Sequence, residues 1–277
     1  MSGADRKPER ETRAGAPVIA AAGFALGPPA HVGLQAADTL LDVRELDAWY
    51  GAAQILRGVS LQVGRGEVVA LMGRNGAGKS TTLKSIMGLV HRRSRTLSFL
   101  GRPVDRLRPF EMARLGMGYV PEDRRVFAEL TVDENLALGA QPPRRWPHGV
   151  AAANWTAADL YALFPVLAPL RARPAGTLSG GEQQMLTVAR TLMGNPFLLL
   201  LDEPSEGVAP IVVEQMLDMI RLLKAGGTSI LLSEQNVAFA RLAADRAFVL
   251  EKGVIRYSGG MDALLADEAL RRQYLTL

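Results

Sequence analysis

The chain has 277 residues, of which 48% are hydrophobic and 22% charged, and this balance suits one or two globular domains with a substantial core. The net charge of +4 is small and the basic residues are scattered, which disfavours a nucleic-acid-binding protein with one basic face. The absence of cysteine excludes disulfides and thiolate metal sites, and no apolar run reaches the roughly 18 residues of a membrane span.

Residues 1–39 differ in composition from the rest of the chain. Four basic side chains precede a charge-free stretch, residues 14–37, that is rich in Ala, Gly and Pro. A basic start before a short apolar segment faintly resembles a secretory signal, but glycines and prolines interrupt the apolar part. We therefore expect a disordered extension or an over-called start of the chain, with a targeting segment as the alternative.

From residue 40 the pattern becomes that of an α/β protein. Strands are predicted over residues 41–46 and 54–63, and a short apolar strand over residues 67–72 runs directly into a glycine-rich loop. A helix is predicted over residues 79–89, immediately after that loop. This succession of strand, loop and helix is the context that a phosphate-binding P-loop requires.

The loop has the residues of a P-loop at their fixed positions: Gly73, Arg74, Asn75, Gly76, Ala77, Gly78, Lys79 and Ser80. Its glycines let backbone N–H groups surround the β- and γ-phosphates, and the helix N-terminus adds a positive dipole end. We expect Lys79 to contact the phosphate oxygens, Ser80 to ligate Mg²⁺ and Thr81 to contact the α-phosphate. The loop thus predicts a site for ATP and Mg²⁺.

Residues 103–176 carry helical patterns, clearest over residues 133–138 and 155–170, and predict a helical insertion in the α/β core. A second glycine-rich turn follows, comprising Leu178, Ser179, Gly180, Gly181, Glu182, Gln183 and Gln184. Ser179 and the N–H groups of Gly180 and Gly181 precede a helix predicted over residues 185–193, and so form a candidate anion site. A simple P-loop kinase or GTPase has no use for this turn, and an ordinary helix cap is the alternative reading.

Two acids end the buried strand predicted over residues 197–201. Asp202 and Glu203 stand at its carboxyl end, where α/β folds place their ligands. We expect Asp202 to hold Mg²⁺, partly through water, and Glu203 to polarise the water that attacks the γ-phosphate.

The remaining elements complete the fold prediction. A helix over residues 211–224 and a strand over residues 229–233 are followed by a hairpin, residues 246–250 and 254–257, that turns at Lys252 and Gly253. The alternation of strands and helices predicts an α/β protein with a mainly parallel sheet and helices on both faces.

The order of the P-loop, the Leu178–Gln184 turn and Asp202-Glu203 resembles the ATP-binding subunits of ABC transporters, from about residue 40 to the C-terminus. The resemblance implies a P-loop NTPase core with an antiparallel β subdomain and a helical subdomain over roughly residues 103–185. It also implies that this turn, the signature turn, caps the γ-phosphate held by an opposing subunit, so that two subunits close on two ATP molecules. Tyr50 would stack on the adenine, a core tyrosine being the alternative.

Residues 120–127, 202–210 and 233–236 are similar to the shorter ATP-binding subunit of branched-chain amino acid uptake systems. Glu122 stands where most ABC proteins have a glutamine that senses Mg²⁺, so the resemblance implies that Glu122 is a further carboxylate at the metal, an exposed glutamate without a role being the alternative. Gln235 stands where most have a histidine on the γ-phosphate, and it can donate a hydrogen bond there without titrating. Ala209 replaces an aspartate of the turn at the dimer interface.

The resemblance therefore implies an ATPase that drives a membrane importer from the cytoplasmic face of the inner membrane. The implied partners are a second ATP-binding subunit (in a heterodimer or a homodimer), two permease subunits docked near residues 122–131 and, indirectly, a solute-binding protein, with no nucleic acid. Branched-chain amino acids are the implied cargo, and urea or short-chain amides are the alternative. A soluble ABC ATPase of translation or DNA repair is disfavoured, because the chain has one cassette and no heptads.

Overall fold

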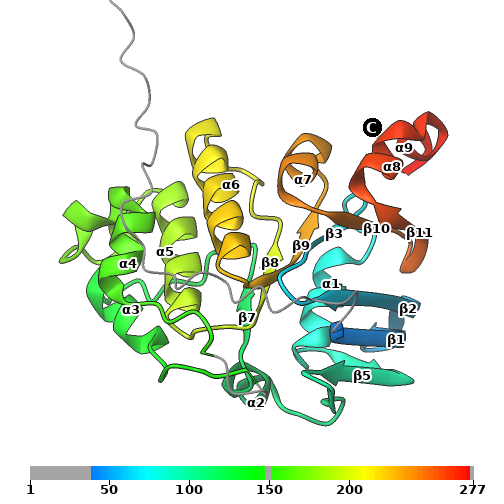
Figure 1. Cartoon of the computed structure of the whole chain (residues 1–277), viewed down its shortest axis with the longest axis horizontal. Coiled ribbons are helices and arrows are strands. Elements are labelled where there is room, and N and C mark those ends of the chain that lie inside the picture. Colours follow the sequence, from blue (N-terminus) through cyan, green and yellow to red (C-terminus); the bar gives the residue numbers. More distant parts are fainter. Residues whose placement is uncertain (1–38, 147–150, 275–277) are drawn as a thin grey trace, which may run out of the picture.

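The computed structural model describes residues 39–146 and 151–274 (Figure 1). The extension expected over residues 1–39 lies outside the described residues, apart from Thr39, which begins the first strand. No described helix combines the length and apolar character that a membrane span requires.

An antiparallel sheet forms the first layer of the fold. Its strands lie in the order β2 (Ala53–Gly64), β1 (Thr39–Tyr50), β5 (Thr96–Phe99) and β6 (Arg102–Pro103), and β4 (His91–Arg93) pairs with the end of β1. Apolar side chains of β1 and β2 turn to one face, which is buried, while charged side chains face outward. This sheet is the antiparallel subdomain that the resemblance implied.

A second sheet of six strands forms the centre of the molecule. Its order is β11 (Val254–Gly260), β10 (Arg246–Glu251), β3 (Val68–Met72), β9 (Ser229–Glu234), β8 (Leu198–Asp202) and β7 (Met117–Val120). All neighbours are parallel except β10 and β11, which form the predicted hairpin. Every residue of β3, β8 and β9 is buried, as expected for central strands of a parallel sheet covered on both sides.

Helices and the antiparallel sheet cover opposite faces of the central sheet. One face packs on α5 (Gly180–Leu192), α6 (Pro210–Ala225) and α7 (Val237–Ala243). The other packs on α1 (Lys79–Ile86) and on the apolar face of the first sheet. The prediction of helices on both faces is therefore right for one face and incomplete for the other, where a sheet provides most of the cover.

The helical region lies beside the edge strand β7 and its neighbour β8 (Figure 1). It contains α3 (Val132–Gly139), α4 (Ala157–Leu163) and α5, with short 3₁₀ helices at Pro165–Leu170 and Ala175–Thr177. Thr131, Thr156 and Ser179 begin α3, α4 and α5 with capping boxes. The remaining helices are α2 (Pro109–Arg114), α8 (Met261–Ala266) and α9 (Glu268–Tyr274).

Two predicted helices differ most from the structure, and one strand of the central sheet was missed. The helix expected over residues 185–193 begins already at Gly180, because Ser179 caps it there. The helix expected over residues 155–170 ends at Leu163 and continues as a 3₁₀ turn, because Pro165 and Pro169 have no backbone N–H to donate to the preceding turn. Strand β7 was not predicted; it lies within the range 103–185 but pairs with β8 of the central sheet.

Candidate functional site

Three neighbouring strands of the central sheet bring the main sequence motifs together. The P-loop follows β3, the Asp202-Glu203 pair ends β8, and Gln235 follows β9, which lies between them. Because parallel strands end on the same edge of a sheet, the motifs meet at its carboxyl edge. This edge is the candidate site.

The P-loop presents an uncapped helix N-terminus to the site. Gly78, the N-cap of α1, has φ +109 and provides no side-chain cap, so the first N–H groups of α1 are available to an anion. A Cβ atom at Gly73 would lie 2.4 Å from the Leu250 carbonyl oxygen, which shows how tightly the loop is folded. Ser80 is half-buried and Thr81 is buried. The loop therefore has the features of a phosphate cradle.

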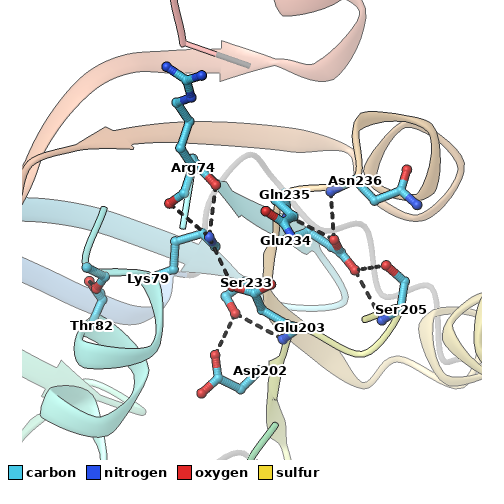
Figure 2. Close-up of polar contacts among 12 residues, drawn as sticks. Arg74, Lys79, Thr82, Asp202, Glu203, Ser205, Ser233, Glu234, Gln235 and Asn236 are labelled. Carbon is cyan, nitrogen blue, oxygen red and sulfur yellow. Dashed lines mark hydrogen bonds and ion pairs between the residues drawn. The ribbon is translucent and has the colours of Figure 1, made fainter. Parts of the chain in front are cut away.

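Lys79 folds back onto the protein and makes three contacts with oxygens (Figure 2). Its Nζ donates to the carbonyl oxygens of Gly73 (2.8 Å) and Arg74 (3.2 Å) and lies 3.0 Å from Oε1 of Glu203. The side chains of Lys79 and Glu203 are 2% and 6% exposed, so both charges are buried and each compensates the other. A phosphate at the loop would compete with Glu203 for this ammonium group.

Asp202 is held by two hydroxyl groups from neighbouring strands. The Ser233 hydroxyl donates to Oδ1 at 2.7 Å, and the Tyr119 hydroxyl donates to Oδ2 at 3.0 Å. Burial, and then the charge of Asp202, raise the pKa of Tyr119, which stays a donor. Sequence reasoning missed both partners, because only the order β9-β8-β7 brings them to Asp202. The carboxylate keeps free lone pairs for a hydrated Mg²⁺.

Glu203 has a left-handed backbone conformation, with φ +46. Its backbone N–H donates to both the carbonyl oxygen and the hydroxyl of Ser233, each at 3.1 Å. A residue other than glycine persists in this region only where its surroundings hold it, and such residues cluster at functional sites. Strand β9 thus sets the direction in which the Glu203 side chain leaves the sheet.

Glu206 adds a second acid beside Glu203. Hydrogen bonding to the Glu203 side chain, then burial and the charges of Glu203 and Glu122, raise the pKa of Glu206 to about 7, while Lys79 opposes the shift. Glu122 is exposed and acts on Glu206 through its charge. Its assignment as a metal ligand stays a prediction.

Glu234 connects the Gln235 segment to the turn after Glu203 through hydrogen bonds (Figure 2). Its buried carboxylate accepts from the backbone N–H groups of Gln235 (2.9 Å) and Asn236 (2.8 Å), and from both the backbone N–H and the hydroxyl of Ser205. Burial raises the pKa of Glu234, and these hydrogen bonds oppose the shift. The sequence analysis assigned no role to Glu234 or Ser205, although both lie within quoted motifs.

The side chains of the remaining candidate residues make none of the contacts described above. Gln235 is half-buried beside Glu234, and Tyr50 is 48% exposed at the end of β1. Trp49 turns to a different neighbour, with its ring 5.4 Å from that of His91. Stacking of Tyr50 on a base and a phosphate contact of Gln235 stay predictions. Figure 2 shows the Arg74 side chain pointing away from Lys79.

The signature turn does not join the P-loop within one chain. Figure 1 shows α5 and α1 on opposite sides of β7 and β8. Ser179 is exposed, and its backbone N–H donates to the Glu182 carboxylate at 2.7 Å in the capping box. The residues Ser179, Gly180 and Gly181 therefore form a separate, outward-facing part of the surface.

Across residues 39–146 and 151–274, no cluster of three or more His, Cys, Asp or Glu side chains could hold a metal by itself. Mg²⁺ on a nucleotide takes one or two protein oxygens and completes its shell with phosphate and water. Ser80 and Asp202 offer a hydroxyl and a carboxylate of that kind.

Known proteins share this arrangement over most of their length. Residues 56–206 match the family model described as ABC transporter. The chain is 41% identical to the high-affinity branched-chain amino acid transport ATP-binding protein BraG of Pseudomonas aeruginosa, over 85% of this chain and 99% of that protein. It is 33% identical to the lipopolysaccharide export system ATP-binding protein LptB of Escherichia coli K12, over 85% and 96% respectively.

Solved structures agree with the fold. The structure of an ATP-binding subunit of an ABC transporter matches with a TM-score of 0.69 at 31% identity, covering 84% of this chain and 95% of that one. An ATP-binding cassette in its ADP conformation matches with a TM-score of 0.69 at 26% identity, covering 85% and 98%.

Proposed function

The chain belongs to the ABC transporter family as an ATP-binding subunit, and we propose that the transporter it drives imports branched-chain amino acids. ATP hydrolysis coupled to transport is the activity of this family, and membrane-embedded permeases are the partners of such a subunit. The cargo, the sister subunit, the solute-binding protein and a peripheral position on the cytoplasmic face of the inner membrane are parts of the proposal.

The observation that carries the choice of cargo is the similarity to BraG along nearly the whole of that protein. A probable branched-chain amino acid transport protein of Archaeoglobus fulgidus, 36% identical over 97% of its length, supports the same choice. The LptB relatives favour a second candidate, lipopolysaccharide export, at lower identity. The cargo never touches an ATP-binding subunit, so its site residues are compatible with either.

Each site residue has its own role in ATP hydrolysis. Lys79 exchanges Glu203 for the β- and γ-phosphate oxygens, and the released Glu203 accepts a hydrogen bond from the attacking water. Asp202 and Ser80 hold Mg²⁺, which neutralises the charge on the phosphate oxygens when bound. Gln235 donates its amide to the γ-phosphate, and Tyr50 stacks on the base.

Two chains complete the site in this proposal. The exposed turn at Ser179 meets the γ-phosphate on the P-loop of an opposing ATP-binding subunit. Loss of the γ-phosphate removes the contact that favours the closed pair, and the resulting motion passes to the permeases. Residues 122–131 form the docking segment for a permease helix.

The test is a pull-down of the tagged chain from its own membranes, followed by uptake assays with cells carrying the wild-type or the Lys79→Ala chain. We expect two multi-span permeases and a second ATPase to co-purify, and leucine uptake to fail in the Lys79→Ala cells. Recovery of lipopolysaccharide export proteins, or loss of urea or short-chain amide uptake instead, would overturn the cargo. Recovery of ribosomes or DNA-repair proteins without permeases would overturn the importer.

A further inference from the structure

Arg124 contacts two turns that lie more than fifty residues from it in sequence. It belongs to the docking segment that follows β7, and its Nη2 donates to the Gly207 carbonyl oxygen at 3.1 Å. Gly207 lies in the turn Ser205–Gly207, which is separated from Glu203 by Pro204 alone. The other end of that turn is bound by Glu234, through Ser205.

The same guanidinium lies against the first residue of α5. A Cβ atom at Gly180 would fall 2.3 Å from Nη1 of Arg124 and 3.3 Å from its Cζ. The space beside Gly180 is thus filled by the end of the Arg124 side chain, and a side chain at position 180 would displace the guanidinium from this place.

Arg124 differs from an ordinary surface arginine in its backbone conformation and in the surroundings of its charge. Its φ is +48, and its carbonyl oxygen accepts from the Val126 N–H at 2.6 Å. Among the described residues Arg124 forms no ion pair, whereas the neighbouring Arg125 lies 2.8 Å from Asp123. A cation at the N-terminus of α5 opposes the helix dipole, so the isolated chain gains little from placing it there.

We propose that Arg124 is a positioning residue that fixes the signature turn, Ser179–Gly181, to the turn Ser205–Gly207. The planar guanidinium reaches both turns at once, because Nη2 donates to Gly207 while Nη1 lies beside Gly180. Because Arg124 also belongs to the docking segment, a displacement of that segment moves both turns together. The proposal rests on the proposed function, in which the signature turn reaches the opposing subunit.

The first variant is Arg124→Gly, which removes the guanidinium while glycine accommodates the positive φ without strain. Arg124→Lys keeps a donor for Gly207 but has no second nitrogen to lie beside Gly180. Arg221→Ala is the matched control, because Arg221 is an exposed arginine whose hydrogen bond is to Asp218 on its own helix, α6.

Two measurements on the full chain separate positioning from general destabilisation. In hydrogen exchange on the wild-type and variant chains, we expect Arg124→Gly to speed exchange in the signature turn and in residues 205–210 together. Its melting temperature and its affinity for a fluorescent ATP analogue at the P-loop should match the wild type. Exchange that rises in one turn only, or in neither, would overturn the proposal.

ATP hydrolysis by the complex recovered from membranes gives the functional readout. We expect Arg124→Gly to lower kcat about tenfold or more with KM nearly unchanged, Arg124→Lys to fall between, and Arg221→Ala to match the wild type. An Arg124→Gly complex with wild-type kcat would also overturn the proposal. If the wild-type complex hydrolyses no ATP, the proposed function fails, and hydrogen exchange alone decides the role of Arg124.

Discussion

Gln235 places an amide at a position where most ABC proteins carry a titrating imidazole. Its side chain can donate a hydrogen bond but cannot change charge, so the wild-type ATPase should lack a pH step from this position. We expect Gln235→His to add a step near the ordinary histidine pKa of about 6.5 in the pH profile of kcat. The measurement is steady-state ATP hydrolysis between acidic and alkaline pH.

The control for this change is Gln215→His, which adds the same imidazole to α6, outside the site. Its pH profile should follow the wild type. A Gln235→His profile identical to that of the wild type would argue against a phosphate contact for the side chain at position 235.

Sequence reasoning at the scale of single residues found the side chains that belong to continuous motifs. Lys79, Asp202 and Glu203 meet at the carboxyl edge of the sheet because the P-loop and the acids each follow a buried strand. The same reasoning could not identify Tyr119 as a partner of Asp202, because that contact depends on which strand lies next to β8. Strand order is a property of the folded sheet and leaves no local signal.

Within the helical elements, Asn135 of α3 is the residue that shapes the docking segment. It is fully buried, accepts from the Phe127 N–H at 3.0 Å, and donates to the carbonyl oxygens of Phe127, Leu130 and Thr131. Asn135→Ala would leave several of these buried groups without partners. We expect the free energy of unfolding to fall by about 2 to 3 kcal/mol, measured by urea denaturation.

Leu138→Ala on the same helix is the comparison, because Leu138 is 56% exposed. Its free energy of unfolding should change by less than about 0.5 kcal/mol. Equal losses in the two variants would mean that the hydrogen bonds of Asn135 do not hold the docking segment.

Elements with strong local signals were predicted well, and the exceptions have local causes. The apolar strands β3, β8 and β9 were recognised because each is a short buried run bounded by polar residues. The start of α5 was missed because glycines disfavour helix in isolation, and only the capping box at Ser179 shows that the helix begins there. The short strands β4, β5 and β6 carry too few residues for a pattern.

For the molecule as a whole, Glu206 should make stability fall as pH rises through the neutral range. Its folded pKa of about 7 lies above its ordinary value of 4.5, so the folded chain binds its proton more tightly than the unfolded chain. The stabilisation is complete below about pH 4.5 and is lost as pH rises toward and past 7. Glu206→Gln should remove this part of the pH dependence.

The measurement is urea denaturation of both proteins, without nucleotide, at several pH values from 5 to 8. The advantage of the wild type over Glu206→Gln should shrink steadily across this range, since only the wild type carries the titrating group. A constant difference between the two proteins would show that Glu206 does not titrate in the window between its two pKa values.

The whole architecture was the most predictable level, because alternating strands and helices admit few arrangements. Periodicity did not indicate that β1, β2 and their neighbours cover one face of the central sheet, and only the family resemblance implied such a subdomain. The apolar runs in the sequence look the same whether a strand is covered by another sheet or by helices. The sequence pattern therefore identifies a covered strand without identifying what covers it.

The buried pair of Lys79 and Glu203 makes each side chain the charge partner of the other. In the proposed cycle, the cation that would hold the phosphates and the acid that would act on water neutralise each other's charge until ATP separates them. The two side chains pair again when the products leave.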